Sequence, residues 1–307
     1  MYTFITNPNA RSGLGAKVWK ELEQILEERE VSYDVHFTKY QRHATRIVRD
    51  LTSDGMEHTI IILGGDGTVD EVINGITDLS KVTLGYIPIG SSNDFARFFG
   101  FRSTPSETLQ NILDSKETTS MNIGRITYHK GEKTKRFAVS AGAGFDAAVC
   151  HQSVTSRIKV ALNRLHLGRL TYVGIALSQL LALKPCTVHV SIDGKEEVSY
   201  ERTYFVAAMN HPYEGGGFKF CPDADPCDGK LNITIIAGLS KLKVLFLLPT
   251  AFKGWHTVFK GVHTFTSDHF QIRSDRPLPI HTDGEPVPYS DTMTASLEHE
   301  TVKLITY

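Results

Sequence analysis

The run Gly64-Gly65-Asp66-Gly67-Thr68 constrains the fold more than any other feature of this sequence. It directly follows the apolar segment Thr59–Leu63 and precedes a segment with a helical pattern, Val69–Asp78. A buried strand, a glycine turn and a helix start are typical of a phosphate-binding element, because glycines let backbone N–H groups approach anionic oxygens and a helix N-terminus favours negative charge. Asp66 would repel a phosphate, so its carboxylate indicates a Mg²⁺ ion or a hydroxyl proton at the same turn. The alternative is an ordinary strand-to-helix turn with an aspartate near the helix cap.

The first third of the chain alternates strand-like and helix-like segments. The strand-like segments are Tyr2–Thr6, Ser32–Phe37, Thr59–Leu63 and Thr83–Ile89, and the helix-like segments are Leu14–Glu30, His43–Thr52, Val69–Asp78, Asn93–Phe99 and Ser106–Asp114. Repeated strand–helix units predict a doubly wound parallel sheet, which binds ligands beyond the carboxyl ends of its strands. Four turns that follow the strands should therefore lie at one edge of the sheet: Asn7–Gly13, Thr38–Lys39, Gly64–Thr68 and Gly90–Asp94.

Beyond about residue 121 the pattern changes to strands with little helix between them. The strand-like segments are Asn122–His129, Arg136–Ala141, Thr187–Ile192, Glu197–Met209, Leu231–Ala237, Thr264–Arg273 and Thr294–Ile305. Asp193-Gly194 forms a hairpin turn between two of them, and Ser156–Lys184 is mostly helical in pattern. We therefore predict an α/β nucleotide-binding domain over residues 1–120, followed by a β-sandwich domain with a helical insert over residues 121–296. Whether roughly the last ten residues return to the first domain is left open.

Composition narrows the class of protein. The chain has 307 residues, 41% of them hydrophobic, and a net charge of −1, which gives no overall field that would attract nucleic acid. Its four cysteines form no CxxC pair, as expected for free thiols in a reducing compartment. No window reaches the roughly 18 apolar residues of a membrane span, and Met1–Thr6 is too short for a secretion signal. We expect a cytoplasmic protein that contacts the inner face of the membrane peripherally at most.

The helical insert Ser156–Lys184 combines basic and apolar residues. Its leucines and its arginines Arg157, Arg164 and Arg169 would suit weak, reversible contact with a membrane interface. The same composition also fits an amphipathic helix that covers the sheet with its charges in solvent, which the pattern favours. Charge reversal at the three arginines would separate the two interpretations.

Three further segments carry groups suited to chemistry. Gly90–Phe95 offers hydroxyl groups for phosphates and a carboxylate, Asp94, although serine, asparagine and aspartate are also ordinary helix caps. Pro222–Gly229 places three carboxylates in one irregular segment, which suits Mg²⁺ or Ca²⁺ and equally suits a structural turn. His281–Pro286 has the pattern of a hairpin, in which Glu285 directly follows the tight turn.

Taken in order along the chain, these motifs resemble one known family. The set consists of Asn7-Pro8, Ser12-Gly13, Thr38, Gly64–Thr68, Gly90–Ala96, Gly142–Asp146, Asp228-Gly229 and Asp283–Pro286. It is similar to the diacylglycerol kinase catalytic-domain family, above all to the soluble bacterial lipid kinases, and the resemblance covers nearly the whole chain. The glycine turn Gly64–Thr68 is the specific member of the set, and the others gain weight from their order.

The resemblance implies an ATP- and Mg²⁺-dependent lipid kinase that phosphorylates a primary hydroxyl of diacylglycerol or a related lipid. Asp66 and Asp94 would serve the catalytic metal or the phosphates, and Glu285 would be the general base. Asp228 would belong to a structural Mg²⁺ site that also uses loop carbonyls near Asp225 and Lys230. The residues that would hold ATP are Asn7, Pro8, Ser12, Gly13, Thr38, Gly64, Gly65, Asp66, Gly67, Thr68 and Ser91.

This sequence departs from the family pattern at four positions. Ser91 stands where relatives often have threonine, and the hydroxyl is retained. Asn122 replaces an aspartate that many relatives carry, so a carboxylate that faces the metal is absent. At the structural site Cys227 replaces an aspartate and Asp225 replaces a lysine, which bears on whether that site holds an ion.

Two other functions remain open from the sequence. One is a small-molecule kinase with a similar glycine turn, such as an NAD kinase or a phosphofructokinase type. The other is a non-catalytic sensor of nucleotide or lipid on the same fold, which would bind without turnover. The segment Asn7-Pro8 and the segment Asp283–Pro286 favour the lipid kinase. A homodimer is also left open, and no nucleic-acid partner is expected.

Overall fold

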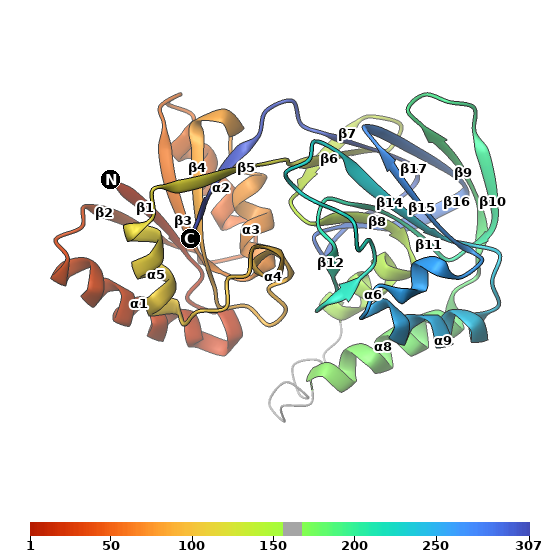
Figure 1. Ribbon diagram of the computed structural model, residues 1–307, viewed down its shortest axis with the longest axis horizontal. Coiled ribbons are helices and arrows are strands. Elements are labelled where there is room, and N and C mark those ends of the chain that lie inside the picture. Colours follow the sequence, from red (N-terminus) through yellow and green to blue (C-terminus); the bar gives the residue numbers. More distant parts are fainter. Residues whose placement is uncertain (156–167) are drawn as a thin grey trace.

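The computed structural model describes residues 1–155 and 168–307, which form two domains side by side (Figure 1). Arg157 and Arg164 lie outside the described residues. The first domain holds a six-stranded sheet in the order β2-β1-β3-β4-β18-β5. Its strands are β1 (Tyr2–Thr6), β2 (Tyr33–Phe37), β3 (His58–Gly64), β4 (Val82–Pro88), β5 (Glu117–Met121) and β18 (Val302–Thr306).

Helices cover both faces of this sheet. They are α1 (Ala10–Glu28), α2 (His43–Thr52), α3 (Asp66–Ile73), α4 (Asp94–Phe99) and α5 (Pro105–Asp114), with a short 3₁₀ helix, η1 (Leu79–Lys81). Because side chains alternate along a strand, Ile60 and Ile62 of β3 enter the core with α2 and α3, whereas Ile61 enters the core with α1 and α5. Only β5 runs antiparallel to its neighbour in this sheet, so the predicted doubly wound parallel sheet is confirmed.

The second domain is built on a ten-stranded antiparallel sheet. Its main path is β15-β14-β11-β8-β16-β17-β6-β7, and β9 and β10 extend it beside β16. The bounds are β6 (Gly124–Tyr128), β7 (Lys133–Phe137), β8 (Ser140–Gly144), β9 (Cys186–Ile192), β10 (Val198–Thr203), β11 (Phe205–Met209), β14 (Leu231–Ile236), β15 (Val262–Ser267), β16 (His269–Thr282) and β17 (Glu285–Leu297). A separate short hairpin joins β12 (Tyr213–Glu214) to β13 (Phe218–Lys219).

The two faces of this sheet bury different cores. Ile126 of β6 and Leu231 of β14, from distant parts of the sheet, share one core, which means that the sheet closes over itself as a sandwich. The opposite face of β11 and β14 packs under helices α6 (Phe145–Thr155), α8 (Gly168–Ala182) and α9 (Lys241–Ala251). The 3₁₀ helix η2 (Trp255–Val258) follows α9, and its His256 contacts Phe220 of the same core. Among the described residues no helix is long and apolar enough to cross a membrane.

Several predicted segments proved to be two elements. The segment Thr294–Ile305 spans the end of β17 and most of β18, which belong to different sheets, so the end of the chain returns to the first domain. Likewise Glu197–Met209 divides into β10 and β11, and Thr264–Arg273 into β15 and β16. Helices α6 and α9 were not predicted. In α9 the apolar residues are nearly continuous, and in α6 the apolar and polar residues do not alternate at a helical spacing.

Candidate active site

The four predicted turns meet at one edge of the parallel sheet, as expected. Together with Glu285 from the second domain they surround a cavity of about 430 Å³. The residues that line it are Asn7, Asn9, Ala10, Arg11, Thr38, Lys39, Tyr40, Gln41, Gly65, Gly67, Thr68, Glu71, Gly90, Ser91 and Glu285. The sequence analysis did not assign Arg11 and Lys39 as binding residues, although each is a basic residue in a turn after a strand, which is a usable signal for an anion site.

Glycines at the turn after β3 are required by space. A Cβ on Gly64 would lie 2.4 Å from Oγ1 of Thr68, and a Cβ on Gly65 would lie 3.0 Å from Cα of Gly90. Oγ1 of Thr68 in turn lies 3.4 Å from Nδ2 of Asn7. The backbones of the turns after β1, β3 and β4 are therefore held close together at the first turn of α3, where unpaired N–H groups favour an anion.

The turn after β1 is strongly bent. Arg11, Ser12 and Gly13 have φ values of 45°, 61° and 97°, so three successive residues adopt the left-handed conformation. Arg11 lines the cavity, whereas Pro8, Ser12 and Gly13 belong to the same segment without lining it. Gly13 is suited to its position because it has no Cβ to strain at positive φ.

Asp66 and Asp94 connect this edge to neighbouring elements. The carboxylate of Asp66 accepts the backbone N–H groups of Asp94 (3.1 Å) and Phe95 (3.3 Å) at the start of α4. Burial, followed by the charge of Asp94, raises the pKa of Asp66 to about 7. Asp94 lies 3.4 Å from Nε of Arg97, and its other oxygen accepts the N–H of Gly216 at 2.7 Å. Neither carboxylate lines the cavity itself.

Glu285 is positioned by the tight turn between β16 and β17. The carboxylate of Asp283 accepts backbone N–H groups from Ala138 (2.7 Å), Val139 (2.8 Å) and Ser140 (3.0 Å). These bonds hold Asp283 at a left-handed φ of 50°, and Gly284 follows at 80°. Glu285 consequently lies against the phosphate-type turn in the wall of the cavity, since a Cβ on Gly67 would lie 3.1 Å from its Oε1.

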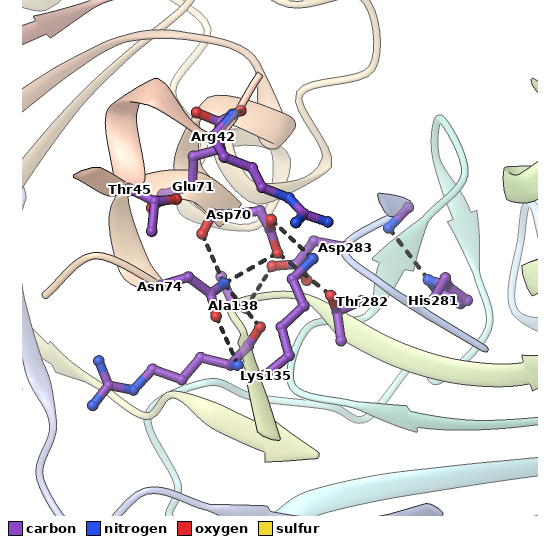
Figure 2. A network of polar contacts seen from close by, with 12 residues as sticks. Arg42, Thr45, Asp70, Glu71, Asn74, Lys135, Ala138, His281, Thr282 and Asp283 are labelled. Atoms are coloured by element: carbon purple, nitrogen blue, oxygen red, sulfur yellow. Dashed lines mark hydrogen bonds and ion pairs between the residues drawn. The ribbon is translucent and has the colours of Figure 1, made fainter. Parts of the chain in front are cut away.

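Behind Glu285 the two domains share a buried polar network that the sequence analysis did not predict (Figure 2). Asp70 of α3 forms an ion pair with Lys135 of β7 at 3.1 Å, and Oγ1 of Thr282 lies 3.5 Å from its other oxygen. Asn74 accepts the N–H of Arg136 at 2.9 Å. The available signal was a carboxylate at an apolar position of α3, between Val69 and Val72.

Glu71 has a structural task at the same helix. Its two oxygens accept the backbone N–H groups of Arg42 (2.7 Å) and Ala44 (3.1 Å), which fixes the start of α2 beside the cavity (Figure 2). Arg42 itself has a φ of 67°, a conformation that these bonds stabilise.

A second buried cluster lies on the other side of the β16–β17 turn. Nε2 of His281 is 3.0 Å from Asp146 and 3.1 Å from Glu214, and its Nδ1 accepts the N–H of Gly284 at 3.2 Å. Burial raises the pKa of Glu214. Burial opposes protonation of His281, but its acidic neighbours, Glu214 and Asp146 among them, raise the pKa of His281 well above its ordinary value. Because Nδ1 accepts the N–H of Gly284, the ring carries a proton on Nε2, the atom nearest to both carboxyl groups. The three side chains could approach one cation, but a protonated Nε2 cannot be a metal ligand.

The proposed structural metal segment lies outside the cavity. Asp225 accepts the N–H of Cys227 at 2.9 Å, and Asp228 accepts the N–H of Lys230 at 2.8 Å. The Lys230 ammonium pairs with Asp268. Asn122 ties the segment to the start of the second domain by accepting the N–H of Gly229 at 2.9 Å.

Comparison with known proteins agrees with this geometry. Residues 1–126 match the family described as "Diacylglycerol kinase catalytic domain", and residues 139–305 match the "YegS C-terminal NAD kinase beta sandwich-like domain". The chain belongs to the kinase family that these two domains together define. A diacylglycerol kinase of Mycobacterium tuberculosis is 29% identical over 92% of this chain and 88% of its own length.

Solved structures show the same fold. A crystal structure of a Bacillus anthracis protein covers 100% of this chain and 95% of that one, with a TM-score of 0.77 and 22% identity. An NAD kinase from Archaeoglobus fulgidus in complex with ATP covers 100% and 94%, with a TM-score of 0.54 and 11% identity. The resemblance to the NAD kinase is thus more distant than the resemblance to the Bacillus protein.

Proposed function

We propose that this kinase transfers the γ-phosphoryl group of ATP, with Mg²⁺, to a primary hydroxyl of diacylglycerol or a related lipid. One observation carries the proposal: the carboxylate of Glu285 lies beside Gly67 in the wall of a cavity whose other walls are strand-end turns suited to phosphates. A base beside a phosphate cradle is the arrangement that phosphoryl transfer to a hydroxyl needs. The family match and the name of the Mycobacterium relative support the lipid as acceptor.

On the nucleotide side, ATP phosphates would contact the backbone of Gly65–Thr68 and the hydroxyl of Ser91, with Asn7 and Thr38 beside them. Arg11 and Lys39 line the same cavity and would offset the negative charge. Gly64, Pro8, Ser12 and Gly13 would act indirectly, by shaping the two turns. Positioning and charge neutralisation are most of what a protein contributes to this reaction.

The residues present suit Mg²⁺. Asp66, Asp70, Asp94 and Asp283 are carboxylates at or behind this edge, whereas the cations paired with them are Lys135 and Arg97. Oxygen donors with excess negative charge favour a hard divalent cation, and Mg²⁺ usually needs only one or two carboxylates because substrate phosphates complete its shell. Asp66 and Asp94 would hold it from behind the turns, since neither lines the cavity itself. Bound Mg²⁺ would neutralise charge on the phosphates.

In the transfer step, the carboxylate of Glu285 would accept the proton of the lipid hydroxyl as its oxygen attacks the γ-phosphorus. The bond from that phosphorus to the ADP oxygen breaks as the new P–O bond forms. The Asp283 bonds to Ala138–Ser140 would keep Glu285 at the cavity, and so reduce the cost of orienting it.

A second Mg²⁺ is proposed at the segment that holds Asp225, Asp228 and Lys230, in a purely structural role. One oxygen of each aspartate accepts a local N–H, and Asp225 also takes a hydrogen bond from the Cys227 thiol, which leaves Asp228 as the freer carboxylate for a cation. Cys227 does not add a hard donor, because burial raises the pKa of its thiol to about 11. Binding there should be weak. It is measured by following the melting temperature as Mg²⁺ is added, in wild type and in an Asp228→Asn variant.

The function is tested by incubating the protein with γ-labelled ATP and Mg²⁺. The acceptors would be dioleoylglycerol in mixed micelles, a total lipid extract and NAD in separate reactions. Labelled phosphatidic acid from wild type, with almost none from Glu285→Gln, is the expected result. Labelled NADP would favour an NAD kinase, and nucleotide binding without any labelled product would favour a sensor.

A further inference from the structure

A band of large apolar side chains is exposed along α9 and η2. Val258 is 82% exposed, Phe246 71%, Trp255 66% and Leu242 62%. The band, here called the α9–η2 ridge, consists of Leu242, Leu245, Phe246, Phe252, Trp255, Val258 and Phe259. Soluble proteins rarely expose so many large apolar groups within one short segment unless the surface is used for binding.

The sequence of α9 explains why this ridge exists. The helix buries Val244, Leu247 and Ala251 against the core under the antiparallel sheet. Leu242, Leu245 and Phe246 occupy the remaining faces and therefore point away from that core. A helix that is apolar on all sides is normally enclosed by protein or lipid, whereas α9 lies at the surface of the second domain (Figure 1).

The sequence that contains the ridge carries charge of one sign. From Gly229 to Ser267 the sequence contains five lysines and no aspartate or glutamate. Lys243, Lys253 and Lys260 are exposed, and among the described residues they form no ion pair. Apolar side chains flanked by unpaired lysines complement an anionic bilayer, which offers negative headgroups above an apolar interior.

The end of α8 continues the same surface. Leu181 is 65% exposed and Leu177 40%, and the carbonyl of Leu181 accepts a hydrogen bond from Nζ of Lys241. Figure 1 shows α8 and α9 side by side along one side of the second domain. Two neighbouring elements thus present apolar side chains in the same region.

The ridge is also connected to the contact between the two domains. The ring of Phe252 stacks on Phe218 of β13, with ring centroids 3.9 Å apart. The segment between β12 and β13 then reaches the first domain, where Gly216 donates its N–H to Asp94. A bilayer at the ridge would therefore lie close to a segment through which the second domain contacts the start of α4 in the first domain.

We propose that the α9–η2 ridge docks on an anionic lipid bilayer, with its apolar side chains at the boundary of headgroups and acyl chains and its lysines among the headgroups. This inference rests on the proposed function for its link to a lipid acceptor. A second copy of the chain is a poorer occupant, because a two-fold contact would bring Lys243, Lys253 and Lys260 near their own copies without an acidic partner in the ridge.

The test uses the natural reporter in the ridge. The chain has two tryptophans, and Trp19 is buried, so a Trp19→Phe background leaves Trp255 as the only emitter. Vesicles of phosphatidylglycerol and phosphatidylcholine, and vesicles of phosphatidylcholine alone, are titrated into this protein. We expect a blue shift of Trp255 emission and binding at least about tenfold tighter to the anionic vesicles, reduced by salt.

Paired variants separate docking from chemistry. Phe246→Ser with Val258→Ser, and Lys243→Glu with Lys253→Glu, should each weaken sedimentation with anionic vesicles at least about tenfold. Met56→Ser with Val198→Ser, which removes apolar groups exposed elsewhere, should not. Phosphorylation of water-soluble dioctanoylglycerol should stay near the wild-type rate in all of them.

The outcomes distinguish the two proposals. Unchanged vesicle binding by both ridge variants, or no binding by wild type, overturns the docking surface whatever the kinase assay shows. A ridge variant that turns a dimer into a monomer in sedimentation velocity, without any vesicle binding by wild type, also overturns it in favour of a second copy. Loss of vesicle binding in the ridge variants supports docking even where no lipid is phosphorylated, in which case the proposed function alone fails.

Discussion

Gly65 and Gly90 pack backbone against backbone at the ends of the neighbouring strands β3 and β4. A Cβ on Gly90 would lie 2.6 Å from Cα of Gly65 and 2.5 Å from Oδ1 of Asn93. Gly65 has a φ of −111°, which any residue can adopt, so the missing side chain at this contact is a requirement of space. The two turns form one surface because neither residue has a side chain.

Gly90→Ala should therefore separate the two turns. Forcing a methyl group into a packed contact costs typically about 1–3 kcal/mol, and the displaced backbone would lose its fit to phosphates. We expect a lower melting temperature and a KM for ATP raised at least about tenfold, measured in the same preparation. Gly174→Ala is the matched control, because a Cβ at Gly174 meets nothing within 4 Å. Equal effects of the two substitutions would contradict the role given to the contact.

Asp66 should make the stability of the metal-free protein depend on pH. Burial and the charge of Asp94 raise its pKa from 3.8 to about 7, so in this window the folded protein holds a proton that the unfolded chain releases. The contribution of Asp66 to stability is present below about pH 4 and is lost as pH rises through about 7. The free energy of unfolding is measured in urea for wild type and for Asp66→Asn. The value for wild type minus the value for the variant should fall from pH 4 to pH 8. Mg²⁺ with ATP should reduce this fall; parallel curves under all conditions would be evidence against it.

The sequence predicted the turns that line the cavity well and the network behind it poorly. Turns such as Gly64–Thr68 are local, because strand, glycines and helix start are adjacent in the chain. The partners of Asp70 are not local: Lys135 and Thr282 reach it from β7 and β16 of the other domain. The break between β17 and β18 contains Glu298–Thr301, without the glycine or proline that usually marks a turn. Asp283 looked like a hairpin residue, and only the fold shows that its carboxylate gathers three backbone N–H groups.

Lys135→Met tests the ion pair between the domains. Burial raises the pKa of Asp70 to about 8, and Lys135 opposes this rise. Removing one partner of a buried pair leaves the other uncompensated, which costs roughly 3 kcal/mol when the carboxyl is ionised. We expect the loss of unfolding free energy to be larger at pH 9 than at pH 6, where Asp70 can hold a proton. Asp70→Asn should restore part of the stability in the Lys135→Met background; a loss that is independent of pH and not rescued would refute the account.

Glu285→Gln tests the general base directly. A lipid hydroxyl has a very high pKa, so its attack on phosphorus is helped by a group that takes the proton in the transition state, typically by about 10²–10⁴-fold. Glutamine keeps the size of Glu285 but has no basic oxygen, and Asp283 still accepts its three N–H bonds, so the turn should keep its shape. We expect kcat to fall by about two to four orders of magnitude, with unchanged ATP affinity by calorimetry and an unchanged melting temperature.

Asp283→Asn is the informative comparison. It should lower the melting temperature as well as kcat, because the amide nitrogen of asparagine cannot accept a backbone N–H. Nearly full activity in Glu285→Gln would mean that Glu285 is only a neighbour of the turn, and the base would then have to be sought at Asp66 or Asp94.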